Sequence, residues 1–244
     1  MRRTALLLGV GLVAALPQLA QARPDVAPRL TIYAAASLTE VFPRIDRRSA
    51  YSFAGSNQLA LQIRQGAPAD VFASAAPNFT QALYRERLVE KPRTFASNAL
   101  VLAVPRSNPA GLRTLFDLRS RDVKLVVGTA AVPIGAYTRQ VLRRLGLSDA
   151  LSKVVSEEPD VKSIVGKLAL GEADAGFVYR TDVRAAGGRL RAFPIPARGQ
   201  PNVRYEIAVV RASRQKAAAR AWIRALTQTA RARVLLRRAG FIVR

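Results

Sequence analysis

The stretch LTIYAAASLTE, residues 30–40, decides the fold of this chain. Its first five residues, Leu30 to Ala34, are mostly apolar and predict a strand. Ser37 then opens the pattern Ser37-Leu38-Thr39-Glu40, which has the spacing of a capping box, so we predict a helix over residues 38–48. A buried strand that passes directly into a helix is the unit from which α/β proteins are built.

This strand-to-helix unit recurs along the chain. Further strands are predicted over residues 50–54, 70–74, 124–128, 175–179 and 205–210, with another apolar run over 99–104. Further helices are predicted over residues 57–65, 78–86, 135–145, 160–170 and 213–238. We therefore predict an α/β protein with largely parallel sheets, in two lobes. Lobe I is predicted to contain residues 27–99 and 206–244, and lobe II residues 100–205.

Residues 1–22 have the features of a secretory signal peptide. Arg2 and Arg3 give a positive start, residues 5–15 form an apolar run too short to span a bilayer, and Ala20-Gln21-Ala22 is a cleavage pattern. No later segment is long and apolar enough to cross a membrane. We therefore predict an exported protein without stable membrane insertion. The missing lipid-attachment cysteine favours the periplasm as its location.

The composition excludes several classes of function. The 244 residues include no cysteine and no histidine. Disulfides, thiolate metal sites, cysteine nucleophiles, serine–histidine triads and imidazole zinc sites are therefore impossible. An enzyme with Ser37 or Ser56 as nucleophile stays an alternative, although the sequence places no evident base beside either serine.

The chain is strongly basic. Its net charge of +23 falls to +21 (23 − 2) when Arg2 and Arg3 leave with the signal peptide. Such a charge is typical of nucleic-acid-binding proteins. Here the basic residues are scattered along the chain, no basic-plus-aromatic stacking motif accompanies them, and the chain is predicted to be exported. We predict no nucleic-acid partner and a solvated basic surface that attracts small anions.

Four strand-to-helix junctions place a candidate anion-binding group at the start of a helix. They contain Ser37, Ser56, Pro133-Ile134-Gly135, and Asp160 before Val161. Helix N-termini carry unpaired N–H groups and a partial positive charge, so several in one cleft bind an anion without lysine or arginine. Tyr179, at the end of an apolar strand, adds a hydroxyl at a position suited to a ligand in a crevice. The spacing alone favours ordinary helix caps at these junctions and a core tyrosine at position 179.

A series of motifs in the same order resembles the periplasmic molybdate-binding proteins of ABC transporters. The motifs are Ala34-Ala35-Ala36-Ser37-Leu38-Thr39; Phe53-Ala54-Gly55-Ser56; Gly66-Ala67-Pro68-Ala69-Asp70-Val71-Phe72; Pro133-Ile134-Gly135-Ala136-Tyr137; Pro159-Asp160-Val161; Gly176-Phe177-Val178-Tyr179 with Asp182; and Gly240-Phe241. They run from about residue 30 to the C-terminus, so the resemblance covers almost the whole mature chain.

This resemblance implies a type II periplasmic-binding-protein fold, in which two α/β lobes joined by crossing strands close on a tetrahedral oxyanion. It implies neutral donors for molybdate or tungstate: the hydroxyl and backbone N–H groups of Ser37 and Ser56, the backbone N–H groups of Ile134 and Val161, and the Tyr179 hydroxyl. Molybdenum enters only as the bound oxyanion, with no direct protein–metal ligand and no cofactor. The implied partners are an ABC permease and its ATPase, and we expect a monomer that is not an enzyme.

Three features depart from the family's pattern. Ile134 stands where a small residue is usual, residues 46–50 form a shorter segment than usual, and the arginine content is high. None of them removes a donor. Because all the named groups donate, we expect a fully ionised anion to be preferred over hydrogen phosphate, whose proton would face a donor. A binding protein for another small anion such as sulfate stays the alternative.

Overall fold

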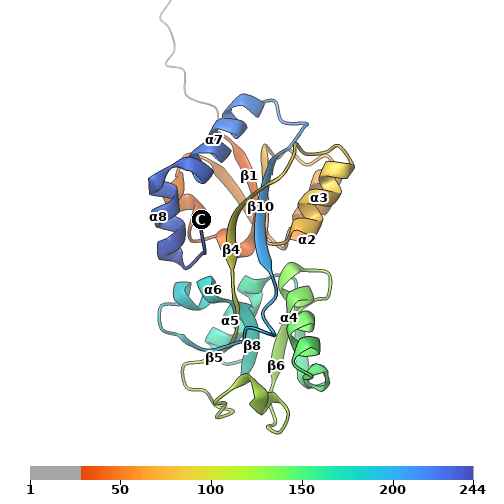
Figure 1. Ribbon diagram of the computed structural model, residues 1–244, viewed down its shortest axis with the longest axis vertical. Helices are drawn as coiled ribbons and strands as arrows, with labels where there is room; N and C mark the ends of the chain where they lie inside the picture. Colours follow the sequence, from red (N-terminus) through yellow and green to blue (C-terminus); the bar gives the residue numbers. More distant parts are fainter. Residues whose placement is uncertain (1–28, 244) are drawn as a thin grey trace, which may run out of the picture.

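The computed structural model describes residues 29–243 and has two α/β lobes, one above the other in Figure 1. The sheet of the first lobe has the strand order β2-β1-β3-β10-β4, and that of the second β7-β6-β8-β5-β9. The first sheet contains β1 (Thr31–Ala35), β2 (Ala50–Ala54), β3 (Val71–Ser74), β4 (Arg93–Asn98) and β10 (Val203–Val209). The second contains β5 (Leu100–Pro105), β6 (Leu125–Gly128), β7 (Val154–Glu158), β8 (Ala175–Tyr179) and β9 (Leu190–Pro194). The predicted signal peptide, residues 1–22, lies outside the described residues.

Both sheets are mixed, and three strands of each run parallel. The parallel sets are β2-β1-β3 and β7-β6-β8, whereas β10 runs antiparallel to β3 and β4, and β5 antiparallel to β8 and β9. The α/β architecture predicted from the sequence is confirmed, but β4, β7 and β9 were not predicted. All three lie at sheet edges and are partly exposed, so they lack the apolar runs that identify a buried strand.

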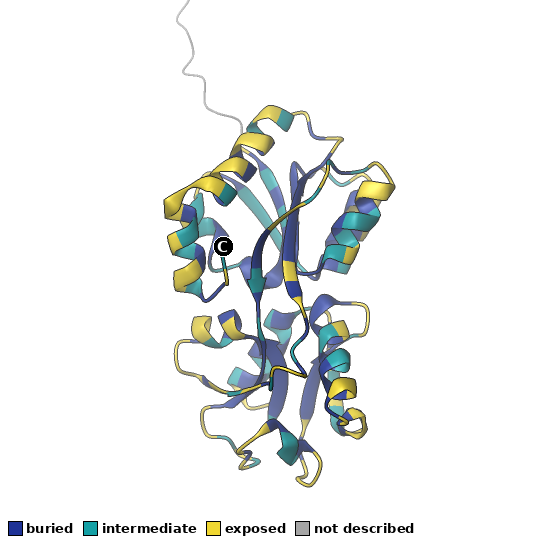
Figure 2. Ribbon diagram, in the orientation of Figure 1, coloured by how far each residue is buried: buried dark blue, intermediate teal, exposed yellow. Residues whose placement is uncertain are grey.

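Helices cover both faces of each sheet. In the first lobe, α2 (Ser56–Arg64) and α3 (Pro77–Arg85) lie on one side, and α7 (Lys216–Gln228) and α8 (Ala230–Ala239) on the other (Figure 1). In the second, α4 (Pro133–Arg144) lies opposite α5 (Val161–Leu170) and α6 (Arg180–Ala185). Buried residues fill the central strands of each sheet and continue to the level where the lobes meet (Figure 2). Among residues 29–243, no helix has the length and hydropathy that crossing a bilayer requires.

Two helices differ from their predicted extent. The helix expected over 38–48 is replaced by a 3₁₀ turn, η1 (Ala36–Leu38), and the short α1 (Phe42–Ile45), because Pro43 has no N–H and restarts the helix. The helix expected over 213–238 breaks at Thr229, which is extended (φ −81°, ψ 140°). The Thr229 side chain accepts the Ala232 N–H and so begins α8 as a cap.

The chain crosses between the sheets twice. It passes from β4 to β5 through Ala99, and from β9 to β10 through residues 195–202. The lobe limits 27–99, 100–205 and 206–244 stay a prediction. Because β10 begins at Val203, we propose residue 203 as the second limit. The ends of β1, β2, β3 and β8 all face the gap between the lobes, and they place the residues of the pocket described next.

Candidate functional site

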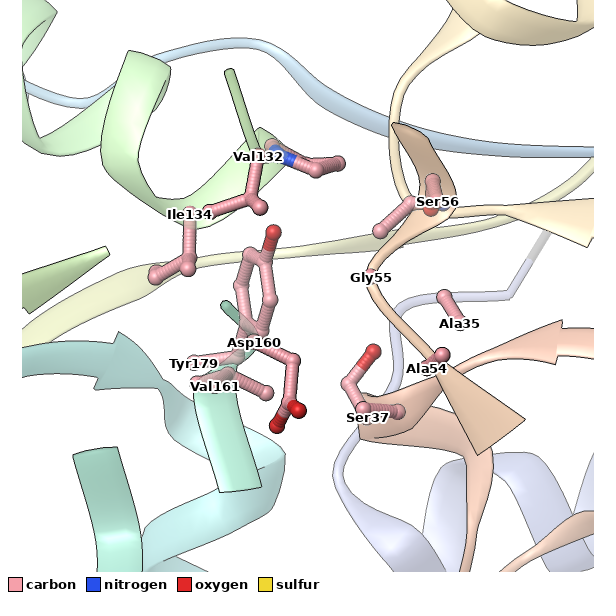
Figure 3. A pocket seen from close by; sticks show the side chains of 13 residues that line it. Ala35, Ser37, Ala54, Gly55, Ser56, Val132, Ile134, Asp160, Val161 and Tyr179 are labelled. Carbon is pink, nitrogen blue, oxygen red and sulfur yellow. The ribbon is translucent and has the colours of Figure 1, made fainter. Parts of the chain in front are cut away.

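A small pocket lies between the lobes, at the ends of these strands. All five residues that the sequence nominated line it: Ser37, Ser56, Ile134, Val161 and Tyr179. In Figure 3 the two serines of the first lobe face the three residues of the second across the pocket. The space between the lining atoms is at most about 230 Å³. Pockets for drug-sized ligands begin at roughly 300 Å³, so this one suits a smaller solute.

In the first lobe, both serine hydroxyls already bind another protein group. Ser56 is the first residue of α2, and its Oγ accepts the Ala75 N–H at 3.1 Å. Ser37 lies in η1 with its Oγ 2.7 Å from the Tyr205 hydroxyl oxygen. The capping box predicted at Ser37 is therefore wrong, because η1 has no side-chain cap and the hydroxyl contacts Tyr205 instead. Both serines are buried, so their hydroxyl protons are directed by these few contacts.

The helix starts of the second lobe present backbone donors. Pro133 occupies the first turn of α4 and has no N–H, and no side chain caps this helix. The first free N–H of α4 is therefore that of Ile134. At α5, Asp160 is the N-cap that the sequence predicted, and its Oδ1 accepts the N–H groups of Lys162 (2.7 Å) and Ser163 (3.1 Å). This leaves the Val161 N–H as the uncapped donor at the pocket.

Tyr179 contributes a hydroxyl that has no partner among the described residues. The side chain is buried, and its Oη makes no hydrogen bond there. Buried polar groups are almost always hydrogen-bonded, so an orphan that points into a pocket indicates a position for a ligand atom (Figure 3). Burial raises the pKa of Tyr179 well above its usual value, so the hydroxyl is a neutral donor.

The pocket contains no cationic side chain among its described lining residues. Its one charged residue, Asp160, directs its carboxylate to the N–H groups of α5. Within residues 29–243, carboxylates do not cluster in threes as they do at metal sites. The chemistry that the pocket offers is hydrogen-bond donation from neutral groups, which suits an acceptor-rich anion.

Beside the pocket, an ion cluster joins the lobes. Lys162 Nζ, from the second lobe, lies 2.8 Å from Glu40 Oε1 of the first lobe and 3.1 Å from Asp182 Oδ1. Asp182 is fully buried, and burial raises the pKa of this carboxyl to about 6, although Lys162 opposes the shift. Lys162 therefore acts as a bridge between the lobes next to the Val161 donor.

Two further contacts show that the lobes are closed on each other. The Tyr137 hydroxyl of α4 donates to the Ala75 carbonyl of the first lobe at 3.5 Å. Gly55 approaches the second lobe so closely that an added Cβ would lie 2.5 Å from the Pro159 carbonyl oxygen. A side chain at position 55 is thus incompatible with this closed arrangement.

Sequence reasoning missed the residues that support the site. Tyr205, Asn98 and Lys162 were not nominated, because each acts through a partner distant in the chain. The only available signal was indirect: Lys162 follows the Asp160-Val161 motif, and Tyr205 begins a predicted strand.

Two α/β lobes, joined by crossing strands and closed over a buried pocket of neutral donors, define a class of protein: one that holds a small solute between its lobes.

The comparisons with known proteins agree with this class. Residues 30–242 match the family model described as bacterial extracellular solute-binding protein. The molybdate-binding protein ModA of Mycobacterium tuberculosis is 34% identical over 217 residues, which cover 84% of this chain and 82% of that protein.

Solved structures share the fold. The periplasmic molybdate-binding protein of Azotobacter vinelandii has a TM-score of 0.78 at 22% identity, covering 88% of this chain and 100% of that one. The sulfate-binding protein SubI of Mycobacterium tuberculosis has a TM-score of 0.73 at 17% identity, covering 87% and 86%. This chain therefore belongs to the bacterial extracellular solute-binding proteins, in the family of the molybdate-binding proteins ModA. It is a binding protein and not an enzyme.

Proposed function

We propose that this protein captures molybdate, and tungstate nearly as well, and delivers it to an ABC importer. The observation that carries the proposal is the convergence of the five nominated residues on one inter-lobe pocket, with the Tyr179 hydroxyl left unpartnered among residues 29–243. The family membership of the chain supports the same ligand. The bound anion is cargo, so the site requires no cofactor.

Seven neutral donors suffice to bind a dianion here. They are the hydroxyl and N–H groups of Ser37 and Ser56, the N–H groups of Ile134 and Val161, and the Tyr179 hydroxyl. At roughly 1.5–3 kcal/mol for each hydrogen bond to a charged acceptor, they contribute on the order of 10–20 kcal/mol. Desolvation of the anion and ordering of the lobes offset much of this gain, which leaves an affinity in the micromolar-to-nanomolar range.

The donor-only character of the pocket favours a fully ionised tetrahedral anion. Hydrogen phosphate would bring a proton toward a donor, which leaves a buried group unpaired. Sulfate is ionised but smaller, so it would reach fewer of the donors at once. Sulfate stays the second candidate, because a sulfate-binding protein shares the fold.

The route of the protein and its partners belong to the same proposal. Residues 1–22 would direct export and be removed, which leaves a periplasmic protein that acts as a monomer. The partners would be a membrane permease, which receives the anion from the closed lobes, and the cytoplasmic ATPase that drives it.

Isothermal titration of residues 23–244 with molybdate, tungstate, sulfate and phosphate tests the proposal. We expect one-to-one binding of the first two anions and little heat from the others. Equal affinity for sulfate would make the ligand assignment wrong. No heat from any of the four would overturn the oxyanion site itself.

A further inference from the structure

The Ser37 hydroxyl makes a hydrogen bond with Tyr205, a residue that does not line the pocket. The Tyr205 hydroxyl lies 2.7 Å from Ser37 Oγ, and both groups are buried. Tyr205 is part of β10, one of the strands at the crossing between the lobes, and lies 168 residues from Ser37 in the chain. The direction of this hydrogen bond decides what Ser37 offers to a ligand.

The amide of Asn98, at the end of β4, determines that direction. Its Oδ1 accepts the Ala99 N–H at 2.9 Å, which turns Nδ2 toward Thr181 Oγ1 (3.0 Å) and the Tyr205 oxygen (3.5 Å). An amide nitrogen only donates, so the Tyr205 oxygen faces a donor on this side. Its phenolic proton is then free for Ser37 Oγ. A phenol is also more acidic than an aliphatic alcohol, which makes it the better donor of the pair.

We propose that Tyr205 is a specificity-determining residue that directs the Ser37 hydroxyl to donate into the pocket rather than to accept there. The relay runs from Asn98 to Tyr205 to Ser37 and ends at the ligand. The direction of the Ser56 hydroxyl proton is fixed in the same way, because Ser56 Oγ accepts the Ala75 N–H at 3.1 Å. Both serine hydroxyls thus accept from the protein and present their protons to the pocket.

This arrangement gives a physical basis for the rejection of protonated anions. A hydroxyl can normally rotate and accept a proton, so serines alone do not exclude hydrogen phosphate. When Tyr205 donates to Ser37 Oγ, the Ser37 proton cannot point back to Tyr205 and points into the pocket, where it meets the proton of such an anion. The inference rests on the proposed function, since it explains the selectivity of that same site for a fully ionised anion.

The variant Tyr205→Phe removes only the hydroxyl. Phenylalanine keeps the ring that packs against Phe95, Tyr179 and Phe241, with ring centroids 5.3–6.0 Å apart. Ser37 Oγ would then rotate freely and accept. We expect molybdate affinity to fall about 3- to 10-fold and the molybdate-to-phosphate affinity ratio to narrow about 10-fold or more.

The matched control is Tyr51→Phe. Tyr51 is a tyrosine of the same sheet whose hydroxyl donates to the Phe42 and Asp46 carbonyls, away from the pocket. Removing the Tyr51 hydroxyl should leave the molybdate-to-phosphate affinity ratio unchanged. Asn98→Ala tests the relay while Tyr205 stays intact, and it should narrow the ratio in the same direction, so the test does not depend on the folding of one variant.

The experiment is titration with molybdate and phosphate of the wild type, Tyr205→Phe, Ser37→Ala and the double variant. If Tyr205 acts through Ser37, Tyr205→Phe changes the ratio in the wild type and has no further effect in the Ser37→Ala background. An unchanged ratio in Tyr205→Phe, or the same change in both backgrounds, would overturn the relay alone. A wild type that binds no anion would overturn the proposed function, and the relay with it.

Discussion

The two lobes contribute to the pocket in different ways. In the first lobe, the hydroxyls of Ser37 and Ser56 are already bonded to Tyr205 and Ala75. In the second, the Tyr179 hydroxyl has no partner among the described residues. The helix starts do not differ in this way, because α2 of the first lobe and α4 of the second both lack a side-chain cap. The serine hydroxyls of the first lobe therefore have protein partners without a ligand, whereas the Tyr179 hydroxyl of the second lobe needs a ligand as its partner. We therefore expect a bound anion to stabilise the closed arrangement, because it supplies the partner that the Tyr179 hydroxyl lacks.

The largest loss of molybdate affinity is expected when the two lobes cannot close. Gly55 has φ −59° and ψ 136°, which alanine adopts without strain. The new Cβ would lie 2.7 Å from Asn57 Oδ1, so the Asn57 side chain must turn away, and we expect Gly55→Ala to change the stability of the unliganded protein only slightly. In the closed arrangement the new Cβ would lie 2.5 Å from the Pro159 carbonyl oxygen. We expect molybdate affinity about 100-fold weaker or more, because the donors of the second lobe stay out of reach. Titration measures it, and wild-type affinity would show that closure is not required.

Removing one hydroxyl donor from each lobe tests whether the two lobes differ as described. Tyr179→Phe and Ser37→Ala should each weaken molybdate binding about 10- to 100-fold, the value of one hydrogen bond to a charged acceptor. Their effects on the unliganded protein should be opposite. Tyr179→Phe removes an unpaired buried hydroxyl and should raise the free energy of unfolding by about 1 kcal/mol. Ser37→Ala removes the oxygen that the buried Tyr205 hydroxyl contacts and should lower the free energy of unfolding by about 1 kcal/mol. Thermal unfolding without ligand measures both, and changes of the same sign would contradict the difference between the lobes.

A smaller effect is expected from the ion pair between the lobes. Glu40→Gln removes the pairing of Lys162 across the gap but leaves Asp182 as its partner. Because Glu40 is partly exposed, its pairing contributes only about 0.2–1 kcal/mol, so we expect affinity to fall about 2- to 5-fold. The loss should disappear in 1 M salt, where such pairs are screened. A loss of 100-fold would mean that ionic attraction, and not donation to the anion, holds the lobes closed.

The smallest effect is expected at Ile134. Its contribution to the pocket is proposed to be a backbone N–H, which Ile134→Ala retains. Affinity for molybdate should therefore change by less than about 3-fold, since the pocket widens but loses no donor. If titration instead showed a large change, the isoleucine side chain would be setting the size of the ligand.

The features predicted correctly from the sequence are those whose contacting residues are close together in the chain. The Asp160 cap and the Pro133 helix start were predicted because the partners lie within three residues. The cap expected at Ser37 failed because the hydroxyl bonds to Tyr205, 168 residues later, and no local pattern encodes that contact.

The other features that the sequence did not predict also depend on more than neighbouring residues. The five residues nominated for binding line one pocket. Their spacing alone favoured ordinary caps, the family resemblance nominated them, and their roles in binding stay predictions. The edge strands β4, β7 and β9 were missed because half-exposed strands lack an apolar run. The inter-lobe contacts of Gly55 and Lys162 were not predictable, since they exist only once both lobes are assembled.

The proposed binding mode can be seen in a crystal structure of the mature protein with tungstate, phased on the anomalous scattering of tungsten. We predict a single strong peak between the lobes, with oxygens of the anion within hydrogen-bond distance of Ser37, Ser56, Ile134, Val161 and Tyr179. A peak held instead by surface arginines, or an anion in the pocket that a lysine or arginine side chain contacts directly, would contradict it.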